Sequence, residues 1–465
     1  MKKSIFTLVL FCTVSLFLLV PSTSGATSTP PDTDRVIVKI TGVDGEETVK
    51  SITWEELQQI KDDRTMRTSS TQVNSQKVQV LEPDYIRHAG PMIHSMETVS
   101  WGAERIGAKT MQKALAPTKN NVIVAVIDTG VDYTHSLLKD RIVNGYDFVD
   151  NDADPMDVQY HGTHVAGVIA DTTPANVKIM PIRALNADGN GYDSHVAEGI
   201  RFAVDHGAAV INMSFGGEEY SRFLTDAIDY ALSKNVLIVV SSGNEGGDTA
   251  NYYPASNEKV IVVSAVDQND NVTQFSNTGT TIDISAPGVG IISSIPGEQK
   301  GSMSGTSAAA PFVSGVAAML MLDNPKSSIQ VIEQLLKKYV DDRGETGWDK
   351  LYGEGVVNVT SYAKISPLAQ PKAVDFISLP GQKNVSLNKL WTVKFDRIFS
   401  DPNIATIKLY NGVTEIPITL SPNLKNKEII VTPKSNYESN TAYRLEIIVQ
   451  NGKKYQMQFE TTGLN

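Results

Sequence analysis

The sequence predicts an α/β fold with a doubly wound parallel sheet, preceded by a small α+β unit and followed by a small all-β sandwich. Three observations carry this prediction. Apolar strands alternate with amphipathic helical patterns from residue 101 to 365, a strand–helix–strand pattern occupies residues 34–88, and short alternating strands with Asn-Gly turns follow residue 366. A chain of 465 residues has room for these units, because one domain usually takes about 100–200 residues.

The first 26 residues have the pattern of a secretory signal. Lys2 and Lys3 precede an apolar run over residues 5–20, and the small residues of PSTSGA follow. Because the run is short and no stop-transfer pattern follows, we expect this segment to be removed and the protein to be secreted and extracellular. The single cysteine, Cys12, lies inside the signal, so the mature protein would contain no disulfide.

The chain is acidic, with a net charge of −11. An acidic surface disfavours nucleic acid and anionic lipid as partners. No later stretch of the sequence is long and apolar enough to span a bilayer. We therefore expect no nucleic-acid partner and, after signal removal, no membrane partner. We also expect the protein to be a monomer.

The central unit alternates strands and helices. The strands NVIVAVID, KIMPIRAL, AAVINMSF, NVLIVVSS and KVIVVSAV are apolar nearly throughout, as expected when both faces of a sheet are covered. The segments DSHVAEGIRFAVDHG and RFLTDAIDYALSKN have the periodicity of amphipathic helices. This order predicts a parallel sheet, in which reactive groups gather at the carboxyl ends of the strands.

Four polar segments lie at such strand ends or at helix starts. Asp128 closes a buried strand, and its carboxylate needs a partner because an unpaired buried charge is costly. His161 precedes a Gly-Thr turn that opens a helix, and Asn244 lies on a glycine-flanked turn after a strand. Ser307 precedes a helical pattern that contains Pro311, which is tolerated only near a first turn, so the helix must begin close to Ser307.

Together these residue types describe an acyl-transfer site. Histidine is the usual general base near neutral pH, and Asp128 can fix its tautomer. Ser307 at a helix N-terminus can act as nucleophile, while Asn244 can donate to the oxyanion with the Ser307 N–H. Taken alone, each residue could have a structural role as a turn or cap residue. The DTG motif at Asp128 alone would also fit an aspartic protease. That motif occurs once and in a parallel α/β pattern, and the joint occurrence of all four favours catalysis.

In these four motifs the chain resembles the subtilases, secreted subtilisin-type serine endopeptidases. The resemblance implies a subtilisin-like sheet and the hydrolysis of protein or peptide substrates. It also implies that Asp128 orients His161, that His161 is the general base and then the acid, that Ser307 attacks the carbonyl, and that Asn244 helps to hold the oxyanion. His164 would be a structural neighbour of this site.

The resemblance places an extended substrate between two edge segments, DGNG at 188–191 and SFGG at 214–217. Tyr252 falls at the floor of the primary specificity pocket, where its ring would shorten that pocket. The implied substrate-binding residues are Gly189, Asn190, Gly191, Ser214, Phe215, Gly216, Ser242, Gly243 and Tyr252.

The flanking units also have counterparts. The N-terminal unit, ending in EPDYIRHAG, resembles the inhibitory propeptide of the family, which occupies the cleft as an intramolecular inhibitor and is then cut off, here between Ile86 and Val99. The C-terminal sandwich resembles a bacterial immunoglobulin-like module. The predicted boundaries are 1–26 for the signal, 27–95 for the propeptide, 96–366 for the peptidase domain and 367–465 for the β-sandwich.

The loop YDFVDNDADPMD, residues 146–157, predicts a calcium ion (Ca2+) as cofactor. Its carboxylates repel one another unless a cation gathers them, and hard oxygen ligands suit calcium. The family resemblance implies Asp147, Asp150, Asp152 and Asp154 as the ligands. The alternative is a solvated acidic loop in an acidic protein.

Two departures from the family pattern leave other functions open. Tyr160 replaces the glycine that usually precedes the histidine, and Ala308 replaces the methionine that usually follows the serine. A catalytically inactive, subtilase-like binding protein is therefore one alternative. A processing enzyme for one specific peptide is the other.

Overall fold

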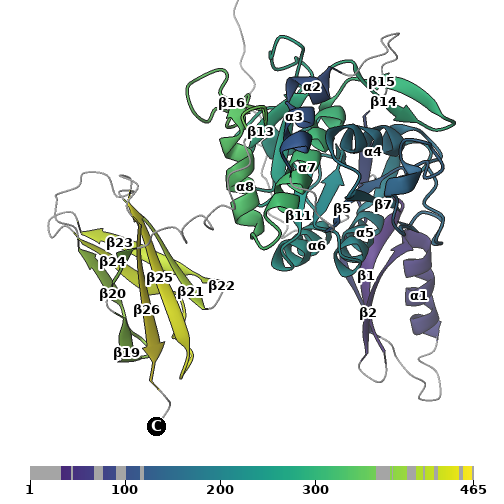
Figure 1. The fold of residues 1–465 in the computed structure, drawn as a ribbon. Coiled ribbons are helices and arrows are strands. Elements are labelled where there is room, and N and C mark those ends of the chain that lie inside the picture. The colour runs from purple at the N-terminus through teal and green to yellow at the C-terminus, as the bar shows by residue number, and fades with distance from the viewer. Residues whose placement is uncertain are drawn as a thin grey trace, which may run out of the picture. The chain divides into compact units, whose positions relative to one another are not determined.

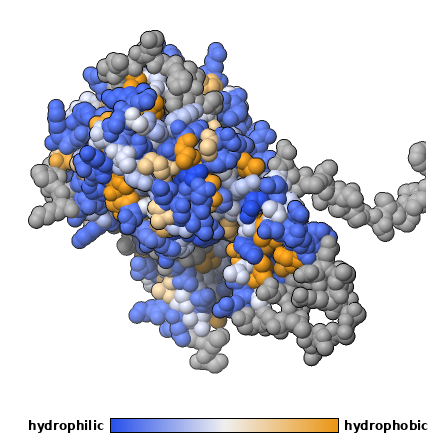
Figure 2. All heavy atoms as spheres, turned by 90° about the vertical axis from the view of Figure 1, so that its right-hand side faces the viewer, coloured by the Kyte–Doolittle hydropathy of each residue, from blue (hydrophilic) through white to orange (hydrophobic). Residues whose placement is uncertain are grey.

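The computed structural model describes residues 33–42, 46–66, 77–90, 101–115, 120–362, 377–379, 381–394, 405–411, 414–423, 428–449 and 454–462. The chain divides into two compact units, residues 1–363 and 364–465. The predicted signal lies outside the described residues. On the face drawn in Figure 2, hydrophilic side chains cover most of the coloured surface and hydrophobic ones form small separate groups.

A nine-stranded sheet forms the centre of the first unit, in the order β16-β17-β13-β12-β11-β9-β5-β7-β6 (Figure 1). Every neighbouring pair is parallel except β16 and β17. The predicted parallel sheet is therefore confirmed. Its strands are β5 (Val122–Asp128), β6 (Tyr146–Asp147), β7 (Val177–Arg183), β9 (Val210–Met213), β11 (Leu237–Ser241), β12 (Ile261–Val266), β13 (Ile284–Pro287), β16 (Val340–Asp341) and β17 (Val356–Val357).

Helices cover both faces of this sheet. Within β5, Val124 and Val126 belong to one hydrophobic core and Ala125 and Ile127 to the other, because successive side chains of a strand point to opposite faces. The first core contains residues of α2 (Gly102–Arg105), α3 (Ala108–Ala114), α4 (His161–Thr172), α7 (Thr306–Asp323) and α8 (Ile329–Lys338). The second contains residues of α5 (Asp193–Asp205) and α6 (Arg222–Ser233).

Helix α7 is apolar around its whole circumference because it runs through the first core. Among the described residues it alone is long and apolar enough to cross a membrane, and its apolar window is 89% buried inside the protein. Burial on all sides explains an all-apolar helix without a bilayer. Other short elements of the region are η1 (Lys139–Arg141), η2 (Thr249–Asn251) and the hairpin of β14 (Ile291–Ile295) and β15 (Gln299–Met303).

The N-terminal unit is a three-stranded antiparallel sheet with one helix. The strands β1 (Arg35–Thr41), β2 (Glu47–Thr53) and β3 (Lys77–Pro83) lie in the order β2-β1-β3, and α1 (Trp54–Met66) follows β2. A reciprocal capping box starts α1, since Thr53 N–H donates to Glu56 at 2.8 Å and Glu56 N–H donates to the Thr53 hydroxyl at 3.0 Å.

The chain then leaves this small sheet and enters the part of the first unit that holds the nine-stranded sheet, which we call the large unit. Strand β4 (Ile86–Ala89) inserts between β8 (Asn190–Tyr192) and β10 (Phe215–Gly216) and pairs antiparallel with both. The second strand of the strand–helix–strand pattern predicted over residues 34–88 is therefore divided: β3 belongs to the small sheet, and β4 belongs to a sheet shared with the large unit.

The second unit is all-β, as predicted, and no helix occurs among its described residues. One sheet has the order β18-β26-β25-β21-β22 with β19 also paired to β26, and the other has the order β20-β24-β23. Both contribute to one core around Trp391 and Phe459. The strands are β18 (Ile377–Ser378), β19 (Gln382–Val385), β20 (Trp391–Lys394), β21 (Ala405–Asn411), β22 (Thr414–Ile416), β23 (Ile418–Asn423), β24 (Glu428–Pro433), β25 (Ala442–Val449) and β26 (Lys454–Thr461).

Candidate active site

Asp128 and His161 form a fully buried pair at the carboxyl edge of the central sheet. Asp128 ends β5 and His161 begins α4. His161 Nδ1 lies 2.8 and 3.0 Å from the two Asp128 carboxylate oxygens, and Thr129 N–H donates to the same carboxylate at 2.8 Å. Because a carboxylate only accepts, Nδ1 carries the proton and Nε2 keeps its lone pair.

The two histidines of the HGTH segment differ in basicity. Burial alone would lower the pKa of His161, but the Asp128 carboxylate outweighs it and the net pKa lies above the usual value. His164 is also buried, and its Nε2–H donates to the Ile291 carbonyl at 2.8 Å. Burial lowers the pKa of His164 to about 4. His161 can therefore accept a proton near neutral pH, whereas His164 stays neutral.

Ser307 is the second residue of α7 and is almost fully buried. Its Oγ–H donates to the Ser214 carbonyl at 2.8 Å. His161 Nε2 is buried and has no hydrogen-bond partner within the described part of the chain. The serine hydroxyl must therefore leave the Ser214 carbonyl before it can donate to His161, which is common for catalytic hydrogen bonds in an unreacted site.

Pro311 accounts for the close link between Ser307 and Ser214. Helix α7 begins beside Ser307, as predicted, but Pro311 is its sixth residue and so lies in the second turn. Because proline has no N–H, the Ser307 carbonyl four residues earlier loses its helical donor. Ser214 Oγ–H donates to that carbonyl at 3.1 Å instead. This bond ties the end of β9 to the helix that carries the serine.

Asn244 follows β11 and presents its amide to the same place. Its Oδ1 accepts from Thr306 N–H at 2.8 Å and from the Thr306 hydroxyl at 3.0 Å. These two bonds fix the amide plane and leave Nδ2 as the free end. A Cβ placed on Gly90 would lie 2.8 Å from Nδ2, and one on Gly305 would lie 3.4 Å from it. The Nδ2 donor therefore stands beside the backbone of Gly90 and close to Ser307.

The predicted edge segments flank the N-terminal unit's last strand. On one side Ala89 pairs with Phe215 and His88 with Gly216. On the other side His88 pairs with Asn190, and Ala89 N–H donates to the Gly189 carbonyl at 2.9 Å. Strand β4 thus lies as a third strand in a cleft between β8 and β10, with its end at Asn244. An extended peptide can bind in the same way, through main-chain hydrogen bonds to both edges.

Comparison with known proteins identifies the family of this chain. The sequence model of the subtilase family (Peptidase_S8) matches residues 119–355. The chain belongs to the subtilase family. Curated relatives include the thermophilic serine proteinase of Bacillus sp. (strain AK1), 45% identical over 239 residues that cover 50% of this chain and 59% of that protein.

In two further relatives, the match with this chain covers a larger share of the relative's own length. Subtilisin DY of Bacillus licheniformis is 36% identical over 279 residues, which are 58% of this chain and 100% of that protein. Thermitase of Thermoactinomyces vulgaris is 42% identical over 207 residues, which are 42% of this chain and 74% of that protein. This subtilase is accordingly a serine endopeptidase of the subtilisin type, and none of these matches favours the inactive alternative.

In this subtilase the ring of Tyr252 lies between two of the predicted substrate-binding residues, Gly216 and Gly243. A Cβ placed on Gly216 would lie 2.3 Å from Tyr252 Cε1, and one on Gly243 would lie 2.9 Å from Cδ1. Gly243 is held against the start of α7, because its N–H donates to the Thr306 hydroxyl at 3.2 Å. Ser242 is buried beside it. The ring thus fills space between the two glycines.

The acidic loop of the subtilase does not bring its four aspartates into one donor set. Asp147 and Asp150 both pair with the Arg183 guanidinium. Asp152 accepts from the Asp154 N–H, and Asp154 accepts from the Tyr133 hydroxyl at 2.7 Å. Across the described ranges, no group of three or more His, Cys, Asp or Glu side chains is placed to hold a metal ion.

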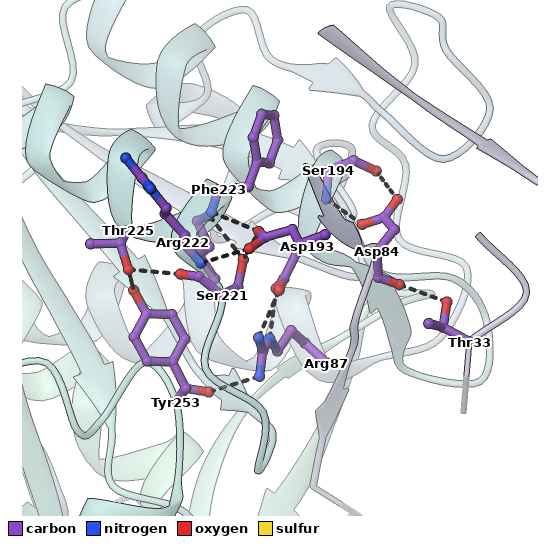
Figure 3. A network of polar contacts seen from close by, with 12 residues as sticks. Thr33, Asp84, Arg87, Asp193, Ser194, Ser221, Arg222, Phe223, Thr225 and Tyr253 are labelled. Carbon is purple, nitrogen blue, oxygen red and sulfur yellow. Dashed lines mark hydrogen bonds and ion pairs between the residues drawn. The ribbon is translucent and has the colours of Figure 1, made fainter. Parts of the chain in front are cut away.

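Sequence reasoning missed two carboxylates of the N-terminal unit that cap helices of the large unit, Glu82 and Asp84, of which Figure 3 labels Asp84. Glu82 accepts from the Ser221 hydroxyl at 2.9 Å and from Phe223 N–H at 2.7 Å, at the start of α6. Asp84 accepts from Ser194 N–H at 2.9 Å and from its hydroxyl at 2.6 Å, at the start of α5. The sequence signal for these contacts was the EPD triplet at residues 82–84, just before β4. Its carboxylates can supply the hydrogen-bond acceptors that the N-termini of helices need from outside the helix.

Proposed function

We propose that this subtilase is a secreted proenzyme whose mature form hydrolyses peptide bonds with Asp128, His161 and Ser307 as a triad. Asn244 assists as oxyanion donor. One observation supports the proposal above all others: the Asn244 amide stands beside Gly90 at the end of β4, and its Oδ1 accepts from the N–H of Thr306, the residue before Ser307.

The first half of the reaction forms an acyl-enzyme. Ser307 Oγ transfers its proton to His161 Nε2 and attacks the substrate carbonyl carbon, and Asp128 stabilises the resulting imidazolium. The negative oxygen accepts hydrogen bonds from Asn244 Nδ2 and from the Ser307 backbone N–H. One such donor is worth roughly 10²–10³ in kcat.

The second half regenerates the enzyme. His161 gives its proton to the leaving amine, so the peptide bond breaks and Ser307 carries the acyl group as an ester. A water molecule then gives a proton to His161 Nε2 as its oxygen attacks the ester. Collapse of the second intermediate returns that proton to Ser307 Oγ and releases the carboxylic acid.

Substrates are protein or peptide chains that bind extended between β8 and β10, as β4 does. The ring of Tyr252 between Gly216 and Gly243 leaves a shallow primary pocket, which suits a small side chain on the residue whose carbonyl is attacked. Glycine stands at that place in the cleft segment, at Gly90. Mapping of the bonds cut in denatured casein tests this: a strong preference for large aromatic residues before the cut would contradict it.

The N-terminal unit acts as the intramolecular inhibitor, because β4 takes the place of substrate on both cleft edges. Residues 91–100, with most of the predicted cleavage region, lie outside the described residues, as does the signal. We propose that the signal directs the chain out of the cell and that the mature enzyme is an extracellular monomer without nucleic-acid or membrane partners. The immunoglobulin-like likeness of the C-terminal unit stays a prediction.

Calcium at the loop around Asp147 also stays a prediction. A melting temperature that falls when EGTA replaces calcium would support it. An unchanged melting temperature would leave Arg183 as the only cation that the loop needs.

The intact mass of the secreted protein tests the proposed function, with wild type beside Ser307→Ala. Wild type is expected to lack the signal and the N-terminal unit, whereas Ser307→Ala should lack the signal alone. Trimming of Ser307→Ala at the same junction would mean that another protease performs maturation. Digestion of casein by the mature wild type separates a general degrader from a processing enzyme for one peptide.

A further inference from the structure

The arginine of β4, which lies in the cleft between β8 and β10, is completely buried. Arg87 has 0% exposure, and its partner Asp193, the first residue of α5, also has 0% exposure. The guanidinium meets the carboxylate through two parallel bonds, Nε to Oδ1 at 2.6 Å and Nη2 to Oδ2 at 2.7 Å (Figure 3). Fully buried arginines are rare, and a bidentate pair of this kind is specific to the planar guanidinium.

The large unit supplies the walls around this arginine. The Arg87 Cζ lies 5.4 Å from the centre of the Tyr253 ring, and Nη1 lies 3.5 Å from the Tyr253 carbonyl. A Cβ on Gly217 would come within 3.0 Å of Nη1, so this glycine makes room for the side chain. The Tyr253 hydroxyl is fixed by Thr225 at 2.6 Å. Asp193, Tyr253 and Gly217 thus form a pocket, which we call the Asp193 pocket.

The register of β4 gives this pocket a place in the substrate cleft. Arg87 lies three residues before Gly90, whose backbone stands at the Asn244 amide, and it pairs with Gly191 on β8. The side chain of His88, the next residue, is exposed and bonds Asn190 instead. If Gly90 takes the place of the residue whose carbonyl Ser307 attacks, Arg87 takes the place of the fourth residue before the cleaved bond. The Asp193 pocket therefore receives the side chain of that fourth residue in a bound substrate.

Departure of the N-terminal unit removes the cation that pairs with Asp193. Burial raises the pKa of the Asp193 carboxyl, and the Arg87 guanidinium opposes that rise by holding the charged form. A substrate with an apolar side chain at this place would leave the carboxylate without its cation, and an acidic one would add repulsion. Lysine brings the charge but not the planar fork that matches both carboxylate oxygens.

We propose that the Asp193 pocket selects substrates with arginine at the fourth residue before the cleaved bond. The proposal rests on the proposed function and narrows it, because it names a side-chain requirement at a second position of the cleft. The N-terminal unit fills the pocket with its own arginine, and a substrate replaces that arginine with another.

Fluorogenic peptides cut by the mature enzyme test the proposal. The peptides share alanine at the attacked residue and differ only at the fourth residue before the bond, which is arginine, lysine or leucine. The arginine peptide should have a kcat/KM roughly 10- to 150-fold above the leucine peptide, the range expected for hydrogen bonds to a charged group. The lysine peptide should fall between them. Equal values for arginine and leucine would overturn the proposal.

Asp193→Asn supplies the second arm. It should remove most of the arginine advantage, measured as the ratio of kcat/KM for the arginine peptide to kcat/KM for the leucine peptide. Asp205→Asn, the same change at the exposed far end of α5, should keep the full advantage. An arginine advantage that survives Asp193→Asn would also overturn the proposal. If Asp193→Asn does not mature, the three peptides on the unaltered enzyme still decide.

The result also distinguishes the pocket from the proposed function. Cleavage of the leucine peptide with no gain for arginine would refute the pocket and leave the protease intact. Failure of the mature enzyme to cut any of the three peptides, together with no cleavage of casein, would refute both.

Discussion

Replacing Tyr252 by alanine is expected to open the primary pocket and redirect cleavage toward large side chains. The ring lies where a Cβ on Gly216 would be only 2.3 Å away, so its removal frees the space between that glycine and Gly243. Full burial of a phenylalanine side chain contributes about 1.5–3 kcal/mol relative to exposure. The ratio of kcat/KM for phenylalanine over alanine at the attacked residue should therefore rise roughly 10- to 150-fold.

The assay uses two peptides that both carry arginine at the fourth residue before the bond and differ only at the attacked residue. Tyr252→Phe is the matched control, because it keeps the ring and should leave the ratio unchanged. The alanine peptide reports whether the variant still has a working site. If Tyr252→Ala cuts the alanine peptide normally but gains nothing with phenylalanine, the ring does not close the pocket and the reasoning is wrong.

Three further changes follow from the site. Asp84→Ala removes a buried acceptor from the start of α5, so the N-terminal unit should be released about tenfold faster after cleavage, measured as the appearance of activity; an unchanged rate would contradict the capping role. Asp128→Asn removes the carboxylate that raises the pKa of His161, so the acidic limb of the pH profile of kcat/KM should move to lower pH. The rate should also fall roughly 10⁴-fold. An acidic limb at the same pH as in wild type would count against this role of Asp128. Ala308→Met places an oxidisable thioether beside the nucleophile, so peroxide should inactivate the variant and spare wild type; equal loss in both would remove this inference.

The architecture was predictable because its signals are local. Strand β5 is apolar on both faces, and the structure gives Val124 and Val126 to one core and Ala125 and Ile127 to the other. Such a strand is typical of a parallel sheet covered by helices on both faces. The four polar motifs were likewise visible, since each follows a buried strand or opens a helix within a few residues.

The remaining features depend on partners far apart in the sequence. Arg87 and Asp193 are separated by 106 positions, and nothing near either residue indicates the pair. The acidic loop predicts a calcium site, and the sequence gives no sign that Arg183, at the end of another strand, pairs with Asp147 and Asp150. A short-range pattern shows that carboxylates need a positive partner, but it does not say whether the fold supplies that partner from the chain.

Labelling with phenylmethylsulfonyl fluoride tests the central claim, that Ser307 is the nucleophile of an Asp-His-Ser site. The mature wild-type enzyme should gain one sulfonyl group by intact mass, with loss of activity and with the modification mapped to Ser307. Asp128→Asn should be labelled much more slowly. A mature wild-type enzyme that cuts casein but gains no label at Ser307 would contradict the claim.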